Sequence, residues 1–417
     1  MSVFKVYSVS FFLISFLLCL FFISLGSGMI FSMGTFSVLD NYFRIDVISF
    51  YLTFLVILLG VYSQLLFLGH LSLSARWFLG LSLFSSLLCF CVNHSVLFWC
   101  FYELSMLPLL YLIFKESPYS ERFLAAWYLA CYLLITSLPL ILMVVYMSMI
   151  NNSFFFSCWR GDDVGIWLLV ILSFIFFTKV PLTPFHTWLP IVHAEATSVV
   201  SVFLSGYVMK LGILGVYRCT SCILNEEFIL YLYACLVMCV GFFIVAAGEL
   251  DGKRWLAFLS LAHIVVPFLA FFIGDWQSVS FCFFYCLGHG LSAGAVFGLL
   301  WYFYDLSNSR NWLLLKSGIN GKSSMILSIV SILSLCSFPT TVQFFCEVGL
   351  IKVSGGLYLY LFFWCVYLFL GGLVPLILCG HLLIRSEWSE MCDCGMFVYF
   401  NFLFFLCLWC YIGLLFI

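Results

Sequence analysis

Charged side chains are scarce in this sequence. Lys, Arg, Asp and Glu together make up only 8% of the 417 residues, whereas 65% of the residues are hydrophobic and the mean hydropathy is +1.21. A soluble chain of this length would form two or three domains, each with a charged surface in contact with water. The lack of charge excludes that arrangement and predicts a protein that lies in a lipid bilayer.

Several kinds of active site lack their sequence signature as well. The chain has no Gly-rich phosphate loop, no dinucleotide-binding fingerprint and no Ser or Cys nucleophile with a neighbouring base. Its net charge of −2 and its lack of a basic patch argue against nucleic acid as a partner. The 20 cysteines are scattered without a disulfide pattern, and the spacing of His186, His193 and Glu195 matches no familiar metal site. We therefore expect this chain to bind no metal and no cofactor.

The apolar residues are grouped into about thirteen runs, each long enough for the roughly 20 helical residues that cross a bilayer. Only short polar segments separate the runs, and no loop is long enough for an independently folded domain. We therefore predict an all-α, polytopic membrane protein with a single membrane domain over residues 1–417. The predicted spans are 6–28, 47–70, 76–93, 95–114, 123–150, 164–182, 197–217, 228–248, 255–273, 279–304, 324–350, 357–384 and 396–416.

The positive residues favour one side of the predicted membrane, which indicates the orientation of the chain. Ten of them fall on the side that holds the N-terminus and the even-numbered connections, and four fall on the other side. The N-terminus should therefore face the matrix or cytoplasm. The ten are Lys5, Arg76, Lys115, Arg122, Lys253, Arg254, Arg310, Lys316, Lys322 and Arg385. The four are Arg44, Arg160, Arg218 and Lys352.

Proline is also scarce, with nine residues in the chain, and this makes its positions informative. Pro181 and Pro184 interrupt one predicted span, and Pro339 interrupts another about 158 residues later. Proline-interrupted helices at matching positions in two halves are typical of repeat-built transporters, whose ion sites lie at the broken helices. We therefore predict two inverted five-helix repeats, at 76–218 and 228–385, each with a broken helix. Proline kinks in an ordinary helix bundle are the alternative.

Four charged residues lie well inside predicted spans: Glu103, Lys179, Lys210 and Glu347. An ionisable group at mid-membrane costs about 2.5–3.5 kcal/mol on insertion scales, so it normally faces a partner or a hydrated interior. In the alternative interpretation, the lysines extend to the membrane surface and the glutamates form structural pairs. Four such groups in one chain favour a functional role over this alternative.

Three histidines accompany these charges: His186 after the first proline break, His263 in LSLAHIVV and His289 in YCLGHGLSAG. Imidazole titrates near neutral pH and can pass a proton along a chain of groups. A single buried histidine is more often a packed residue with hydrogen bonds than part of a relay. Together with the four charges, the histidines favour protons or small cations as the substrate.

Six motifs between residues 101 and 350 stand out from the apolar background, and they are FYELSMLP, TKVPLTPFHTWLPIVHAEA, LSGYVMKLGILGVYR, LAHIVVP, GHGLSAG and FPTTVQFFCE. In this order they resemble the chain 4 family of mitochondrial NADH:ubiquinone oxidoreductase, respiratory complex I. Sibling antiporter-like chains and multisubunit cation/proton antiporters share the fold. Glu347 makes the chain more similar to chain 4, since the siblings typically carry lysine in the second broken helix.

The resemblance implies a role for each residue singled out above. Glu103 matches the glutamate that pairs with a broken-helix lysine, and Lys179 matches that lysine. The remaining matches are Lys210, as the mid-membrane lysine of the following helix, and His263, His289 and Glu347, as a polar axis.

The chain also departs from the family. Ile191 stands where a polar or charged residue usually precedes the histidine, and Thr197 replaces a usual proline. With about thirteen predicted spans, we expect the N-terminal part to be one helix short of the usual fourteen. Loss of one helix fits the charge distribution, because it moves the N-terminus to the matrix side.

The resemblance further implies a core subunit that translocates protons across the mitochondrial inner membrane. Electron transfer from NADH to ubiquinone would occur in partner subunits, which hold the FMN and the iron-sulfur clusters. Expected partners are the other membrane subunits, including sibling antiporter-like chains, and the lipid bilayer. The abundance of Phe, Leu, Val, Cys, Gly and Trp, whose codons are rich in T and G, independently favours an organelle-encoded protein. A cation/proton antiporter subunit and a purely structural subunit are the alternatives.

Overall fold

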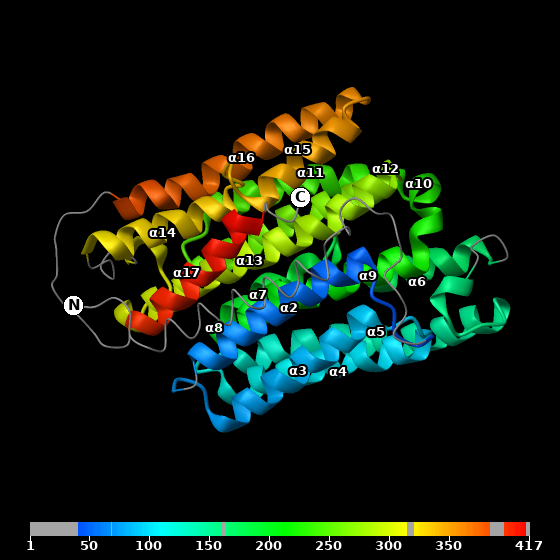
Figure 1. The fold of residues 1–417 in the computed structure, drawn as a ribbon, viewed down its shortest axis with the longest axis horizontal. Coiled ribbons are helices and arrows are strands. Elements are labelled where there is room, and N and C mark those ends of the chain that lie inside the picture. Colours follow the sequence, from blue (N-terminus) through cyan, green and yellow to red (C-terminus); the bar gives the residue numbers. More distant parts are fainter. Residues whose placement is uncertain (1–40, 68, 160–163, 315–320, 384–395, 414–417) are drawn as a thin grey trace.

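The computed structural model of the protein describes five segments of the chain, which are 41–67, 69–159, 164–314, 321–383 and 396–413. Helices make up most of these segments (Figure 1), and the described residues contain isolated β-bridges but no β-strand. The prediction of an all-α fold is confirmed. The predicted span 6–28 lies outside the described residues.

The helices have the following bounds. The α-helices are α2 Val47–Leu66, α3 Leu73–Cys91, α4 Ser95–Glu116, α5 Arg122–Ile150, α6 Ile166–Lys179, α7 Trp188–Glu195, α8 Ser198–Phe203, α9 Met209–Thr220, α10 Leu224–Glu227, α11 Ile229–Gly248, α12 Gly252–Ile273, α13 Trp276–Ser307, α14 Gly321–Leu335, α15 Val342–Ser354, α16 Tyr358–Leu383 and α17 Met396–Ile412. A π-helix, η3 Leu204–Val208, joins α8 to α9, and the 3-10 helices are η1 Phe156–Cys158, η2 Phe185–Thr187 and η4 Ser221–Ile223.

Nine helices in the described segments are long and apolar enough to cross a membrane, and three shorter apolar helices accompany them. Each predicted span from 47–70 onward contains helix, and the span 197–217 contains α8, the π-helix η3 and α9 in succession. Two other spans differ from a single continuous helix. The run 164–182 stops early because α6 ends at Lys179, and the run 324–350 is divided into α14 and α15.

The divisions lie at the prolines that the sequence singled out. Pro181 and Pro184 lie between α6 and α7, and Pro339 lies between α14 and α15. A proline inside a helix removes one backbone hydrogen bond, which the surroundings in a membrane helix can compensate. Four other prolines therefore stay within continuous helices, and these are Pro108, Pro139, Pro267 and Pro375.

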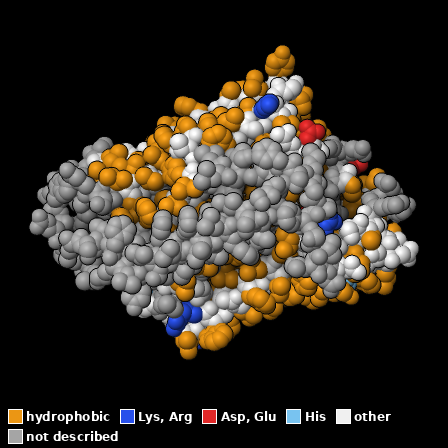
Figure 2. Space-filling view, viewed as in Figure 1, with side chains coloured by type: hydrophobic (Ala, Val, Ile, Leu, Met, Phe, Trp, Pro, Cys, Tyr) orange, Lys and Arg blue, Asp and Glu red, His pale blue; other side chains and the backbone are white. Residues whose placement is uncertain are grey.

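Helix α13 lies at the centre of the bundle, in contact with α2, α12, α14, α15 and α17 (Figure 1). All residues of the most apolar stretch of α13 are buried, whereas only 33% of the residues in the corresponding stretch of α5 are buried. Apolar side chains of α5 instead point outward, such as Ile135 and Leu138 with exposures of 73% and 64%. Figure 2 shows hydrophobic side chains over most of the described surface on one face, with few charged ones between them. This surface suits contact with lipid, and the polar groups are confined to the interior and the helix ends.

Candidate functional site

The first proline break leaves Lys179 as the last residue of α6. The backbone N–H of Val180 donates to the Phe176 carbonyl at 2.9 Å, and the indole Nε1 of Trp188 donates to the Thr178 carbonyl at 3.1 Å. These bonds satisfy carbonyls that a helix end would leave without partners. The helix can therefore end inside the bundle, with Lys179 buried.

The side chain of Lys179 meets Glu103 of α4. Its Nζ lies 3.0 Å from Glu103 Oε1, and the two side chains are 4% and 14% exposed. The same Nζ lies 3.9 Å from the ring centroid of Tyr102, within the range of a cation–π contact. Both contacts compensate the positive charge. Removal of one partner from a buried ion pair typically costs about 3–5 kcal/mol, because the other charge is left uncompensated.

Two glycines of α9 allow this helix to pack closely against the end of α6. A Cβ atom on Gly212 would lie 2.8 Å from Cγ2 of Val180, and a Cβ atom on Gly215 would overlap the ring of Phe176. Larger residues would push the two helices apart, because protein interiors are close-packed. The glycines thus bring α9, which carries Lys210 in its first turn, next to the proline break.

Lys210 is fully buried. It follows the π-helix Leu204–Val208, a wider helical turn of a kind that is frequent at functional sites. Its Nζ donates a hydrogen bond to the carbonyl of Ser205 within that π-helix. Lys210 forms no ion pair with any described residue. Among the described residues, the hydrogen-bond partner of its ammonium is therefore a backbone carbonyl and not a carboxylate.

Helix α13 passes close to this π-helix and carries His289. A Cβ atom on Gly290 would lie 3.2 Å from the carbonyl oxygen of Gly206, so the two backbones nearly touch. His289 is 1% exposed, and neither of its ring nitrogens has a hydrogen-bond partner among the described residues. Buried polar groups normally have partners. Both nitrogens of His289 are therefore uncommitted within the described chain.

His263 of α12 connects His289 to two tyrosines. The two imidazole centroids are 5.2 Å apart. Nδ1 of His263 lies 2.6 Å from the hydroxyl of Tyr367 and 3.2 Å from that of Tyr285, and the two hydroxyls are 3.0 Å apart. Hydroxyls and imidazoles can each donate and accept hydrogen bonds. These four side chains form a polar path through α12, α13 and α16.

Glu347 lies on α15, just after the second proline break. Its Oε1 accepts hydrogen bonds from the Ser337 hydroxyl at 2.8 Å, from the Tyr367 hydroxyl at 3.2 Å and from Gln343 Nε2 at 3.4 Å. Glu347 is 1% exposed. It therefore lies in the interior and joins the polar path through Tyr367.

The six predicted site residues fall into two groups with one residue between them. Glu103 and Lys179 form the ion pair, and the polar path contains the two histidines and Glu347. Lys210 lies on α9, which contacts both α6 and α12. The helices of the two groups are therefore linked through the helix that carries Lys210.

Two residues stand apart from this arrangement. His186, the third histidine of interest, is half-buried with its ring centroid 4.9 Å from that of Phe242, outside the polar path. Lys352 is exposed and forms no ion pair with Glu347. Glu347 is therefore engaged with Ser337, Gln343 and Tyr367 rather than with Lys352.

The sequence interpretation missed three members of the polar path, Tyr285, Gln343 and Tyr367. With 22 tyrosines in the chain, composition does not single out any of them. A local signal exists for two: Tyr285 precedes His289 by four residues, and Gln343 precedes Glu347 by four. Residues four apart lie on the same face of a helix, so each accompanies a residue that was already of interest.

Lys253, which its sequence position assigned to a connection between predicted spans, is buried in the structure. It lies in the first turn of α12, 3% exposed, and its Nζ donates to the Ala196 carbonyl at 2.8 Å. Nearby, Arg310 lies 3.3 Å from Glu195 and 3.4 Å from Asp251. The connections that follow α7, α11 and α13 converge here. Charged side chains at these helix ends therefore form contacts with one another and with backbone carbonyls.

The described residues contain no group of three or more His, Cys, Asp or Glu side chains arranged to hold a metal ion. The ring of His193, which is fully buried, stacks on Phe297 with centroids 4.9 Å apart. Glu195 is engaged with Arg310. The titratable groups of the interior form an ion pair and a hydrogen-bonded path, and this arrangement suits the transfer of protons.

Comparison with known sequences yields one family for most of the chain. Residues 92–372 match the family described as NADH:quinone oxidoreductase/Mrp antiporter, TM. The NADH-ubiquinone oxidoreductase chain 4 of Rhipicephalus sanguineus is 28% identical over 277 residues, 64% of this chain and 63% of that protein. The chain 4 of Locusta migratoria is 26% identical over 324 residues, 72% and 69% of the two chains. The matched region thus spans about two thirds of these relatives.

Solved structures share the architecture at lower identity. A chain of respiratory complex I from Thermus thermophilus with bound NADH matches with a TM-score of 0.73 and 17% identity, over 93% of this chain and 88% of that chain. A chain of the Mrp complex from Dietzia sp. DQ12-45-1b matches with a TM-score of 0.70 and 17% identity, over 85% of this chain and 69% of that chain. At these identities the likeness concerns the fold.

Proposed function

This chain belongs to the NADH:quinone oxidoreductase/Mrp antiporter membrane family, and we propose that it is the chain 4 subunit of a mitochondrial NADH:ubiquinone oxidoreductase and translocates protons. Two similar sequences named as chain 4 support this choice within the family. Glu347 in the second broken helix supports it as well, because it resembles chain 4 at that position.

The observation that carries the proposal is the ion pair between Lys179 and Glu103 at the end of a broken helix. A charged pair in the interior of an apolar bundle is costly to desolvate and adds little stability compared with apolar residues of similar size. Its Nζ–Oε1 distance of 3.0 Å shows that both charges are held in contact. Such a pair is well suited to a switch that changes the protonation of one partner.

The switch operates through the proximity of the two charges. While Glu103 and Lys179 are in contact, each favours the charged form of the other. When the carboxylate moves away, the buried ammonium loses its compensation, and release of its proton relieves the cost of an isolated charge. Return of Glu103 favours uptake of a new proton by Lys179. One cycle of pairing and separation thus moves one proton through this position.

The remaining residues provide the onward route. Lys210, on the helix that packs against the break, receives the proton next in this scheme. His289 and His263 then pass it along the polar path, with the hydroxyl of Tyr367 between His263 and Glu347. Glu347 is the acidic end of this route in the second broken helix. Each member is a group that can both hold and release a proton.

The energy for this transport comes from partner subunits in our proposal. Movement of one charge against the membrane potential costs about 2.3 kcal/mol per 100 mV. Oxidation of NADH by ubiquinone, at the FMN and iron-sulfur clusters of the other subunits, supplies it. This chain binds no redox cofactor and couples to that chemistry through contacts with neighbouring membrane subunits, including sibling antiporter-like chains.

The location follows from the same assignment. We propose the mitochondrial inner membrane, which agrees with the chain 4 names of eukaryotic relatives. The ten-to-four distribution of positive residues supports an N-terminus on the matrix side. Residues 76–218 and 228–385 are proposed as two inverted repeats, and the two proline breaks, one in each segment, support this division.

The alternative is a cation/proton antiporter subunit, which the family description and the likeness to a chain of the Mrp complex keep open. The two functions differ in their assembly. We predict that mild detergent extraction and blue-native electrophoresis will recover this chain in a large complex that gives an in-gel NADH dehydrogenase stain. Recovery in an assembly without that activity, from membranes whose NADH dehydrogenase complex is intact, would favour the antiporter.

A further inference from the structure

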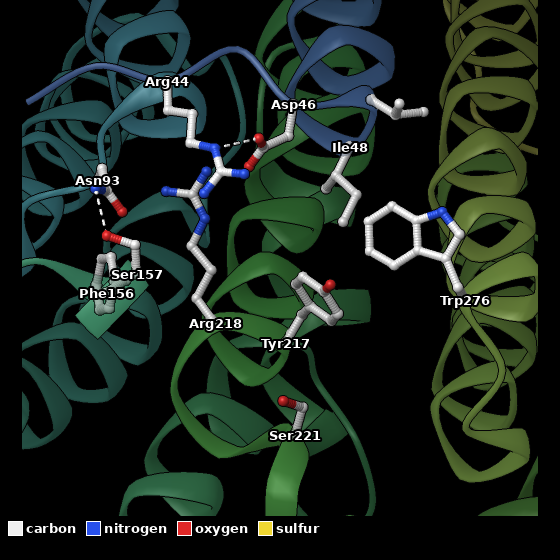
Figure 3. Close-up of a pocket in the computed structure, with 11 residues that line it drawn as sticks. Arg44, Asp46, Ile48, Asn93, Phe156, Ser157, Tyr217, Arg218, Ser221 and Trp276 are labelled. Carbon is white, nitrogen blue, oxygen red and sulfur yellow. Dashed lines mark hydrogen bonds and ion pairs between the residues drawn. The ribbon is translucent and has the colours of Figure 1, made fainter. Parts of the chain in front are cut away.

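A cavity of about 330 Å³ lies among the ends of several helices, and Figure 3 shows residues that line it. Its walls come from the start of α2, the turn between α3 and α4, the segment after α5, the end of α9 and the start of α13. These are all odd-numbered connections in the order of spans, so they lie on one side of the membrane. None of the six proton-site residues is among those that line it.

Two guanidinium groups project into this cavity, from Arg44 and Arg218 (Figure 3). The Nε of Arg44 lies 2.7 Å from Asp46 Oδ1. Arg218 donates to the carbonyl of Phe90 at 2.8 Å and to that of Val92. Asp46 is the one carboxylate among the described lining residues. Two positive charges against one negative charge leave these walls with a net charge of +1.

The cavity retains donors for an anion. A guanidinium has five N–H donors in a planar fork that matches the oxygens of a phosphate group. Arg44 uses its Nε for Asp46, and its terminal nitrogens form no hydrogen bond to the described residues. The first residues of two long helices, Val47 of α2 and Trp276 of α13, also line the cavity. Helix N-termini carry partial positive charge and favour anions.

The place of the cavity at the ends of membrane helices suits the phosphate of a lipid headgroup. Its lining residues lie at helix ends, where membrane helices meet the headgroup region. Trp276 is 46% exposed at its edge, and Tyr217 is half-buried beside Arg218. Trp and Tyr are enriched at this level of membrane proteins. Two of only four positive residues on this side, 174 positions apart in sequence, thus meet in one aromatic-edged cavity.

We propose that this cavity binds a phosphate group between Arg44 and Arg218, presented either by an anionic phospholipid or as inorganic phosphate. The charge of +1, the terminal nitrogens of Arg44 that bond to no described residue and the two helix N-termini all favour such a ligand. The site is separate from the proton path, so its test does not depend on proton translocation.

The test uses the intact assembly in lipid nanodiscs with photoactivatable phosphatidylglycerol, and with photoactivatable phosphatidylcholine as the zwitterionic probe. We expect phosphatidylglycerol to label peptides that contain Tyr217 or Trp276, and Arg44→Gln to reduce this labelling about fivefold, as for loss of one charge-assisted contact. Arg44 is the better target because Arg218 also braces the α3–α4 turn. Lys352→Gln, which removes an exposed positive charge from the same side, should leave labelling unchanged. The amount of assembled complex in each sample is measured on native gels, and the labelling is normalised to it.

Inorganic phosphate is distinguished by a second measurement. If it is the ligand, phosphatidylglycerol labels no more than phosphatidylcholine, while radiolabelled phosphate is retained by the unchanged assembly and lost in Arg44→Gln. Equal labelling and equal phosphate retention in both assemblies overturn the proposal. A further variant changes both Asp162 and Asp163, which follow Ser157 closely in sequence, to Asn. Labelling that occurs only in this variant also overturns the proposal. In that case the carboxylates of the chain itself are the native partners of the arginines.

Discussion

Replacement of Lys179 by methionine lowers coupled NADH:ubiquinone turnover by about tenfold, ~1.4 kcal/mol in activation free energy, while the assembled complex remains present. Methionine keeps an apolar stem of similar length but removes the ammonium that lies 3.0 Å from Glu103. The Glu103 side chain is 14% exposed and so is not fully enclosed by the bundle once its partner is gone. Turnover is measured in coupled membranes and normalised to the complex on native gels.

Lys352→Met is the matched control for this variant. Lys352 is exposed and forms no ion pair with a described residue, so its loss should leave turnover unchanged. Normal turnover and normal proton yield in an assembled Lys179→Met complex would rule out the role assigned to Lys179.

The second large effect is expected for Glu347→Gln, which should slow proton translocation by about tenfold without unfolding the subunit. Glutamine keeps the shape and the hydrogen-bonding capacity of the side chain but cannot titrate. The hydroxyls of Ser337 and Tyr367 donate to Glu347 at 2.8 and 3.2 Å, and both can donate to an amide oxygen as well. Acidification of the medium during NADH oxidation measures the rate.

Glu121→Gln serves as the control, since Glu121 is exposed just before α5. A Glu347→Gln complex that translocates protons at the normal rate would show that titration of Glu347 is not needed. Loss of the assembled complex in this variant alone would instead point to a structural role in the second broken helix.

Much of the fold could be predicted because the membrane imposes simple rules. Apolar runs must form helices that satisfy their own backbone groups, and every predicted span within the described segments contains helix. The two proline breaks were predicted as well, at Pro181 with Pro184 and at Pro339. Helix lengths were less accessible, since the end of α6 at Lys179 depends on bonds such as that from Trp188 to the Thr178 carbonyl.

The ion pair of the candidate site was predictable, but its surroundings were not. The free-energy cost of a charge inside the membrane predicts that Lys179 needs a partner, and the resemblance to the chain 4 family implied that this partner is Glu103. By contrast, Lys210 donates to a carbonyl within a π-helix, and the residues Leu204–Val208 carry no sequence pattern that predicts a π-helix. Tyr367 joins Glu347 from another helix. Such contacts depend on how helices pack, which a single sequence does not reveal.

Lys253 shows what the count of positive residues leaves open. The count assigned this lysine to a connection, and so to one side of the membrane, without predicting its exposure. In the structure, the convergence of several connections buries it against the carbonyl of Ala196. Position along the chain therefore does not predict whether a charged residue is exposed.

Proton translocation through the Glu103–Lys179 pair can be tested by the number of protons moved per electron pair in proteoliposomes that contain the assembled Glu103→Gln complex. Glutamine still accepts a hydrogen bond from Lys179 but carries no charge to exchange with it. We predict a lower ratio than in the unchanged complex, and an unchanged ratio for Glu121→Gln. A normal ratio in Glu103→Gln, accompanied by reduced assembly or stability, would mean that the pair only braces α4 against α6.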